Sequence, residues 1–166
     1  MPHLSNRLPF VLCATLVQSP ANLGSLCRTA EIFRLAELVL PSATVIDHWD
    51  FRRLAVSAQR WQPFSVCSPP QLPGWIKRRQ RSGDSVYALT VSSQGIALPQ
   101  VTFSKRTVAI LGRELTGIPA EIEALCDCAV TIPQLGQVES LNVATAGAIA
   151  AYEYVRQRDQ ASRGDR

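Results

Sequence analysis

The sequence predicts a single α/β domain with a mostly parallel sheet covered by helices on both faces. Short apolar runs typical of buried strands alternate along the chain with segments whose apolar residues recur at helical spacing. No internal repeat or linker divides the 166 residues, and 46% of them are hydrophobic, enough for one full core. We expect the domain to span residues 1–158, with residues 159–166 as a disordered polar tail.

Continuous apolar runs bounded by polar residues, glycine or proline predict the strands. Because these runs are apolar at successive positions, both faces of the sheet should be buried, as in parallel sheets. The polar, proline-containing segment 92–104 is expected to be the connection between two strands. The predicted strands are residues 9–17, 37–40, 64–67, 85–91, 107–111 and 129–132.

Helical spacing and capping residues predict five helices between these strands. Leu23 and Leu26 share one helical face, and Asn22 can cap the start of their helix. Pro119 suits the first turn of another helix, and Ser140 can cap the last and longest one. The predicted helices are residues 22–34, 50–58, 71–81, 119–125 and 140–156.

The charge is distributed unevenly along the chain. Residues 1–106 carry 12 Lys and Arg against 5 Asp and Glu, whereas residues 107–166 carry 5 against 8. Fifteen of the 17 cations are arginine, whose planar fork matches phosphate oxygens. The distribution predicts a polyanionic partner, RNA or DNA, for the first two-thirds of the chain. A coding bias toward arginine is the alternative explanation.

Several classes of protein are excluded by what the sequence lacks. It has neither a run of 18 apolar residues nor a signal-like start, so we expect a cytoplasmic protein without membrane contact. The five cysteines lack metal-ligand spacing, which predicts reduced, apolar thiols and no metal. No G-x-G-x-x-G is present, which argues against an ordinary Rossmann cofactor site. Gly112 and Gly117 have the glycine spacing of a P-loop, but Ile118 replaces the lysine that an NTPase requires.

Three segments combine glycines with polar residues at predicted strand-to-helix junctions, where α/β proteins bind ligands. They are Asn22-Leu-Gly-Ser-Leu-Cys-Arg28, Leu111-Gly-Arg-Glu-Leu-Thr-Gly-Ile118 and Ile132-Pro-Gln-Leu-Gly-Gln-Val-Glu-Ser-Leu-Asn142. The first two also have structural explanations, as a helix cap with a surface arginine and as a carboxylate that accepts N–H groups of the following helix. The third is more specific, because a cap at Ser140 leaves Asn142 unexplained.

Together, the three segments resemble the signature motifs of the SpoU-type (SPOUT class, TrmH-like) RNA 2′-O-ribose methyltransferases. The similarity covers about residues 10–156, and segments 22–33 and 55–63 look like the branch that methylates guanosine 18 of the tRNA D-loop. The resemblance implies a SPOUT α/β knot with a C-terminal deep trefoil, and a homodimer with active sites shared between subunits. It also implies S-adenosyl-L-methionine as methyl donor, S-adenosyl-L-homocysteine as product, and no metal.

The resemblance also assigns roles to individual residues. The implied catalytic residue is Arg28, supported by Asn22, Glu114, Ser140 and Asn142. The implied cofactor-binding residues are Leu89, Gly112, Ile132 and Leu141. We expect RNA contacts from Arg28, Arg52, Arg53, Arg60 and Arg113. One departure from the family pattern is Arg34, which stands where the family usually has glycine.

The predicted function is therefore S-adenosylmethionine-dependent 2′-O-methylation of tRNA at guanosine 18, with tRNA and not DNA as the partner. Alternative substrates are ribosomal RNA and the tRNA wobble ribose, and a non-catalytic RNA-binding knot protein is a further alternative. Two roles are open for Arg28. It is either the base that takes the 2′-OH proton or, since arginine is essentially never deprotonated, a group that positions phosphate and ribose.

Overall fold

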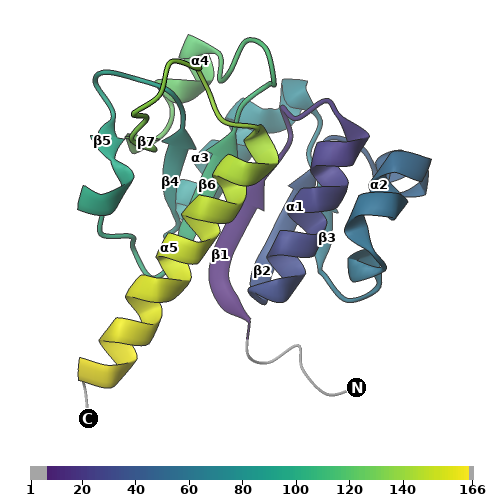
Figure 1. The fold of residues 1–166 in the computed structure, drawn as a ribbon, viewed down its shortest axis with the longest axis horizontal. Coiled ribbons are helices and arrows are strands. Elements are labelled where there is room, and N and C mark those ends of the chain that lie inside the picture. The colour runs from purple at the N-terminus through teal and green to yellow at the C-terminus, as the bar shows by residue number, and fades with distance from the viewer. Residues whose placement is uncertain (1–6, 165–166) are drawn as a thin grey trace.

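The computed structural model describes residues 7–164 (Figure 1). Within this range, seven strands form one sheet in the order β3-β2-β1-β6-β4-β7-β5, and every neighbouring pair is parallel. This confirms the α/β fold with a parallel sheet. The strands are β1 (Leu8–Cys13), β2 (Leu35–Leu40), β3 (Phe64–Val66), β4 (Ser85–Leu89), β5 (Ile96–Ala97), β6 (Thr107–Leu111) and β7 (Cys128–Thr131).

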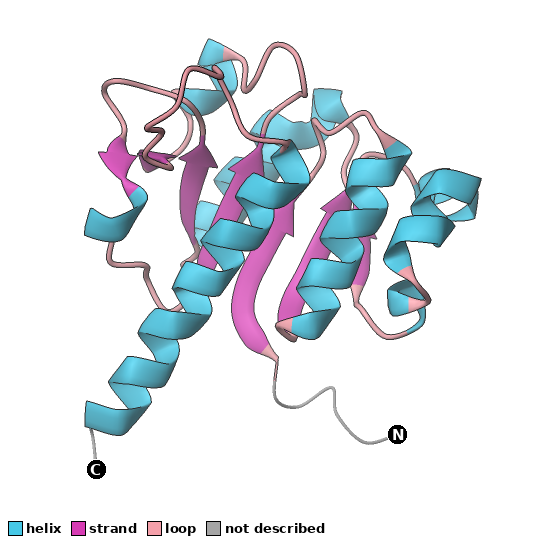
Figure 2. Cartoon of the chain, in the orientation of Figure 1, coloured by secondary structure: helices cyan, strands magenta, loops and turns pink. Residues whose placement is uncertain are grey.

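Helices cover both faces of the sheet (Figure 2). Helices α1 and α5 lie against one face, with α2 packed beside α1, and α3 and α4 cover the opposite face. Short 3-10 turns connect several of these elements. The helices are α1 (Pro20–Ile32), α2 (Trp49–Ala55), α3 (Leu72–Arg81), α4 (Ala120–Glu123) and α5 (Val143–Gly164).

Strand β1 shows why the apolar runs are continuous. Phe10 and Leu12 face the core under α1 and α5, whereas Val11 and Cys13 face the core under α3 and α4. Successive side chains of a strand point to opposite faces, so a strand covered on both sides needs an apolar residue at every position. Each face of the sheet thus has its own hydrophobic core.

Two predicted boundaries around the sheet were wrong. Strand β1 ends at Cys13, because the Val17 N–H turns back to the Ala14 carbonyl at 3.0 Å, and the rest of the apolar run forms a buried turn. The expected connection 92–104 contains the two-residue strand β5 at the sheet edge. A strand this short leaves no periodic pattern to read.

Helix α5 continues past the expected end near residue 156 and reaches Gly164. Its later turns are anchored because the Gln157 side chain accepts from the Phe103 N–H at 2.9 Å and donates to the Val101 carbonyl at 2.7 Å. The described part of the expected disordered tail is therefore helical as far as Gly164, and residues 165–166 lie outside the described residues.

Arg34 joins α1 to β2 in a left-handed conformation, with φ of +51°. Its N–H donates to the Glu31 carbonyl at 2.9 Å and so closes the end of α1. Glycine adopts positive φ without the steric cost that a Cβ introduces. The backbone thus explains why a glycine is favoured here, and this chain tolerates arginine instead.

Close helix packing depends on two glycines. A Cβ on Gly24 of α1 would lie 2.3 Å from the Phe51 carbonyl oxygen of α2, and one on Gly147 of α5 would lie 2.6 Å from Leu26 of α1. The small residues of α5 include Ala150 and Ala151, which are almost completely buried within the chain. They serve intrachain packing, so the small-residue pattern does not by itself indicate a second subunit.

Gly24→Ala is expected to lower the free energy of unfolding by about 1–3 kcal/mol, since the new methyl group meets the rigid backbone of α2. Gly74→Ala in α3 is the matched control, because its Cβ would meet only the flexible end of Arg78 at 3.5 Å. The control should be stabilised by up to about 1 kcal/mol through helix propensity. Urea unfolding measures both, and equal effects would contradict the packing argument.

Candidate active site

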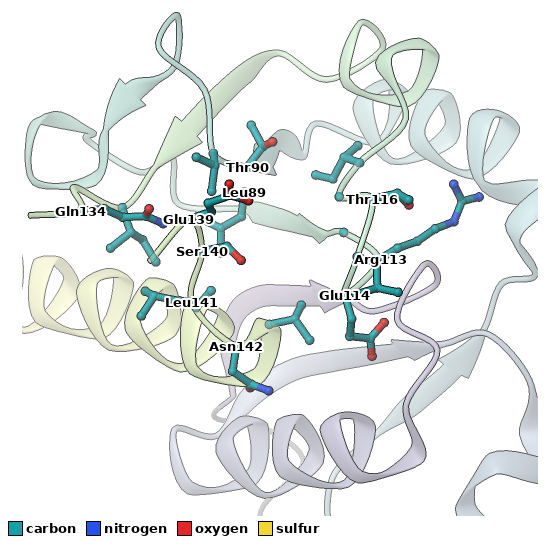
Figure 3. A pocket seen from close by; sticks show the side chains of 18 of the residues that line it. Leu89, Thr90, Arg113, Glu114, Thr116, Gln134, Glu139, Ser140, Leu141 and Asn142 are labelled. Carbon is teal, nitrogen blue, oxygen red and sulfur yellow. The ribbon is translucent and has the colours of Figure 1, made fainter. Parts of the chain in front are cut away.

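The carboxyl ends of β4, β6 and β7 open into a pocket of about 740 Å³ (Figure 3). Its walls come from the loops that follow these strands and from the first turn of α5. The second and third sequence motifs therefore face each other across it. Four of the lining residues are those expected to bind the cofactor, Leu89, Gly112, Ile132 and Leu141.

The loop 112–118 folds back on itself beside this pocket. The backbones of Arg113 and Gly117 exchange two hydrogen bonds of 3.0 Å. A Cβ on Gly112 would lie 2.7 Å from the Gly117 carbonyl carbon, and Gly117 itself has φ of +69°. Both glycines are thus required by the fold of the loop itself.

Glu114 ties this loop to the start of α1. Its carboxylate accepts the Ser19 N–H at 2.9 Å, the Gln18 N–H at 3.1 Å and the Asn22 side-chain amide at 3.1 Å. The donors precede or open α1, so the alternative structural explanation, in which Glu114 accepts N–H groups of the helix after its own loop, is wrong. Burial acts to raise the pKa of Glu114, but these hydrogen bonds outweigh it and hold the pKa below the usual value.

Asn142 extends the same chain of hydrogen bonds to the third motif. Its amide nitrogen donates to the Asn22 side-chain oxygen at 3.0 Å, and its own oxygen accepts the N–H groups of Ala144 at 2.9 Å and Thr145 at 3.2 Å. Asn142 therefore caps α5. The three motifs are joined through Glu114, Asn22 and Asn142, residues separated by up to 120 positions.

Two predicted helix caps are corrected by these contacts. Ser19, not Asn22, caps α1, since its hydroxyl accepts the Asn22 N–H at 3.3 Å. Asn142, not Ser140, caps α5, and Ser140 lies exposed in the preceding loop, where it lines the pocket. The side chains of Asn22 and Ser140 are thus free for roles other than capping.

Arg28 lies outside the pocket. It is exposed on α1, about 9 Å along the helix axis from Asn22. It makes no hydrogen bond or ion pair with residues 7–164. The structure brings Asn22, Glu114, Ser140 and Asn142 together but leaves Arg28 apart from them.

The predicted RNA-binding arginines differ in how free they are. Arg52 pairs with Asp47 at 2.6 Å and Arg53 with Asp50 at 3.3 Å, so each charge is partly neutralised by its own helix region. Arg60 is exposed, and Arg113 lies in the wall of the pocket. The two pairs weaken the prediction that the α2 arginines bind phosphate.

Sequence reasoning missed two acidic residues of the pocket wall, Glu123 and Glu139. Glu123 ends α4, and only the position of that short helix relative to the loops brings it to the pocket. Glu139 lies within the third motif and directly precedes Ser140. Its position in that motif was the signal that could have identified it. Both carboxylates make the pocket acidic.

The thiols take no part in this site. Burial raises the pKa of Cys13, Cys27 and Cys126 to about 12, so these thiols are neutral at pH 7. In the part of the chain that the structure describes, no three His, Cys, Asp or Glu side chains form a group that could hold a metal ion. No helix among residues 7–164 combines the length and apolar character needed to cross a bilayer.

Comparison with known proteins identifies the family. The model of the SpoU rRNA methylase family matches residues 9–152, most of the chain and all three motifs. The chain belongs to this family. Among solved structures, the SpoU methyltransferase AviRb of Streptomyces viridochromogenes in complex with AdoMet is 26% identical and has a TM-score of 0.77, over 95% of this chain and 60% of AviRb.

Curated SpoU relatives act on different RNAs. The tRNA (guanosine(18)-2′-O)-methyltransferase TARBP1 of Mus musculus is 37% identical over 89% of this chain, which spans only 9% of the mouse protein's length. The Thermus thermophilus enzyme of the same activity is 32% identical over 90% of this chain and 76% of its own length. A 23S rRNA (uridine(2479)-2′-O)-methyltransferase of S. viridochromogenes is 30% identical over 84% and 50%.

A structure of the Aquifex aeolicus TrmH/SpoU tRNA modifying enzyme shares the fold, with a TM-score of 0.83 at 24% identity. The alignment covers 97% of this chain and 81% of the A. aeolicus chain. The SpoU fold therefore extends over nearly all the residues of this protein.

Glu114→Gln is expected to lower the free energy of unfolding at pH 7 by about 1–3 kcal/mol, because charge-assisted hydrogen bonds to the start of α1 are lost. The pKa of Glu114 is lower in the folded protein than its unfolded value of about 4.3. Its contribution is therefore present above that value and lost as the pH falls through the folded-state pKa.

Urea unfolding of both proteins between pH 3 and pH 7 measures this effect. Glu121→Gln, an exposed carboxylate on α4, is the matched control and should change stability by less than about 0.5 kcal/mol. A Glu114→Gln deficit that stayed constant down to pH 3 would contradict the assignment of these bonds to the ionised carboxylate.

Proposed function

We propose that this chain is an S-adenosyl-L-methionine-dependent RNA 2′-O-ribose methyltransferase whose substrate is guanosine 18 of tRNA. The observation that carries the proposal is the pocket between the second and third motifs, linked by Glu114, Asn22 and Asn142 to the first. The names of the mouse and T. thermophilus relatives support the tRNA substrate. The AdoMet complex of AviRb supports the cofactor.

The lining of the pocket fits S-adenosyl-L-methionine. Its volume of about 740 Å³ lies within the usual range for cofactor sites. Leu89, Ile132 and Leu141 offer apolar contacts to the adenine and ribose, and Glu123 and Glu139 complement the cationic sulfonium and ammonium groups. When bound, the cofactor supplies an electrophilic methyl group. We keep the expectation that no metal takes part.

The chain's own residues then orient the acceptor. In the transfer the 2′-OH oxygen gains the methyl group, its proton passes to solvent water and S-adenosyl-L-homocysteine leaves, so the direction and hydration of the hydroxyl must be controlled. Ser140 lies exposed at the pocket, and Asn142 is held by Asn22 at 3.0 Å. Glu114 serves as a positioning residue, because its carboxylate is fully used in holding Gln18, Ser19 and Asn22. We assign Arg28 the role of holding the substrate phosphate near the 2′-OH.

Because Arg28 lies outside the pocket of its own chain, we propose that it serves the pocket of a second subunit. The protein would then be a homodimer with shared active sites. Ile32 lies one helical turn after Arg28 on the same face of α1 and is 69% exposed, and Tyr152 of α5 is 58% exposed. Exposed apolar side chains of this kind on α1 and α5 suit burial against a twin subunit. We further propose the trefoil knot of the family at the C-terminal segment, and a cytoplasmic location, where tRNA is available.

Ribosomal RNA is the second candidate substrate, favoured by the relative that methylates 23S rRNA. Phosphate contacts from surface arginines fit either RNA, because they carry no sequence information. The choice between the two depends on which ribose is methylated.

The purified protein, incubated with labelled S-adenosyl-L-methionine and unmodified tRNA transcripts, is expected to methylate guanosine 18. Mapping the modified ribose by primer extension and mass spectrometry checks this. Ribosomal RNA fragments serve as the comparison substrate. Methylation of another nucleotide would overturn the substrate assignment, and absence of transfer to any RNA would overturn the enzyme assignment.

Arg28→Ala is expected to lower kcat by at least about a hundredfold while cofactor binding, measured by calorimetry, is retained. Asn142→Ala should also lower kcat. Mixing the two inactive variants should restore about one quarter of the wild-type activity, because half of the dimers then contain one complete site. No recovery, or a monomer by light scattering, would contradict the shared site.

A further inference from the structure

A second cavity of about 380 Å³ lies beside the cofactor pocket, at the carboxyl ends of β1 and β2. Its lining comes from residues 15–18 after β1, from Pro41 and Ser42 after β2, and from Arg113 after β6. Arg113 lines both cavities, and the Gln18 N–H of the second donates to Glu114 of the first at 3.1 Å. The two cavities therefore share a wall.

The place of this cavity in the sheet favours ligand binding. From β1 the strand order runs through β2 to β3 on one side, and through β6, β4 and β7 to β5 on the other. The chain thus changes direction across the sheet at β1. In open parallel sheets, ligands bind at the carboxyl ends of the strands where this reversal occurs.

Arg113 is positioned by its backbone and left free at its side chain. Its main chain is held by the two hydrogen bonds with Gly117. No ion pair joins Arg113 to the neighbouring Glu114, whose carboxylate instead accepts from Gln18, Ser19 and Asn22. Within residues 7–164 the Arg113 guanidinium has no hydrogen bond or ion pair, and Figure 3 shows it turned away from Ser140 and Leu141.

The chemistry of the lining favours a flat, largely apolar ligand with a polar edge. Six of the ten lining residues are apolar and four carry polar side chains, a mixture that suits a nucleobase better than a phosphate group. Arginine donating in a bidentate manner to guanine O6 and N7 is the most common base-specific contact of proteins. The apolar residues are Leu16, Val17, Leu23, Pro41, Val45 and Pro69.

We propose that this second cavity holds the guanine base of the nucleotide whose ribose is methylated, with Arg113 donating to O6 and N7. The inference rests on the proposed function. The shared wall would place the ribose of that nucleotide between the base cavity and the methyl donor. Guanine selectivity then comes from this chain's own arginine and does not depend on tRNA shape alone.

Base analogues test the proposal with the wild-type protein. The substrates are tRNA transcripts carrying guanosine, inosine, 2-aminopurine or 7-deazaguanosine at position 18. Inosine keeps O6 and N7 and should match guanosine in kcat/KM, whereas loss of either acceptor should lower kcat/KM about tenfold or more. Equal kcat/KM for all four would overturn the assignment. Absence of methylation with every transcript would instead refute the proposed function.

The variant Arg113→Ala should be about equally slow on all four transcripts, and Arg113→Lys should recover only part of the difference between them. Lys105→Ala is the matched control, because it removes one exposed positive charge just before β6, at the amino ends of the strands and away from both cavities. The control should discriminate as the wild type does. If Arg113→Ala lowers kcat/KM but keeps the wild-type discrimination, Arg113 holds a phosphate and the base proposal is wrong.

Discussion

The rest of the site depends on the hydrogen bonds that the Glu114 carboxylate accepts. It accepts from two backbone N–H groups before α1 and from Asn22, which in turn accepts from the cap of α5. A half-buried carboxylate is stable only when donors surround it, so the position of the 112–118 loop depends on these donors. One side chain thereby fixes the relative positions of two helices and a loop.

Three glycines allow the loop and the two helices to come close enough for these hydrogen bonds to form. Gly112 and Gly117 let the loop fold back beside the pocket, and Gly147 lets α5 approach α1 closely enough for Asn142 to reach Asn22. The close packing of α1 and α5 and the hydrogen bonds among Glu114, Asn22 and Asn142 therefore support each other. The same closeness leaves α1 with one outward face, which carries Arg28 and the exposed Ile32, and the function of that face depends on what lies against it.

The sequence predicts the sheet, the helices and the ring of pocket residues well, because strand runs, helical spacing and motif loops are local signals. The prediction fails where contacts with segments distant in the sequence determine the local structure. Strand β5 exists only because β7 offers it an edge, and the last turns of α5 persist because Gln157 bonds the 101–103 segment. Ser19 and Asn22 were indistinguishable as caps without the backbone. The distance of Arg28 from the pocket could not be predicted, since it depends on the orientation of α1.

The hydrogen bonds that join Glu114, Asn22 and Asn142 also have a consequence for biosynthesis. The hydrogen bond between Asn22 and Asn142 joins residues 120 positions apart, so a nascent chain that ends before Asn142 cannot form it. At about 5–20 residues per second, the first strands wait several seconds on the ribosome before the last motif emerges. During that interval the loop that carries Ser140 and Asn142 is missing from the wall of the pocket. The pocket is therefore complete only after the third motif has been synthesised.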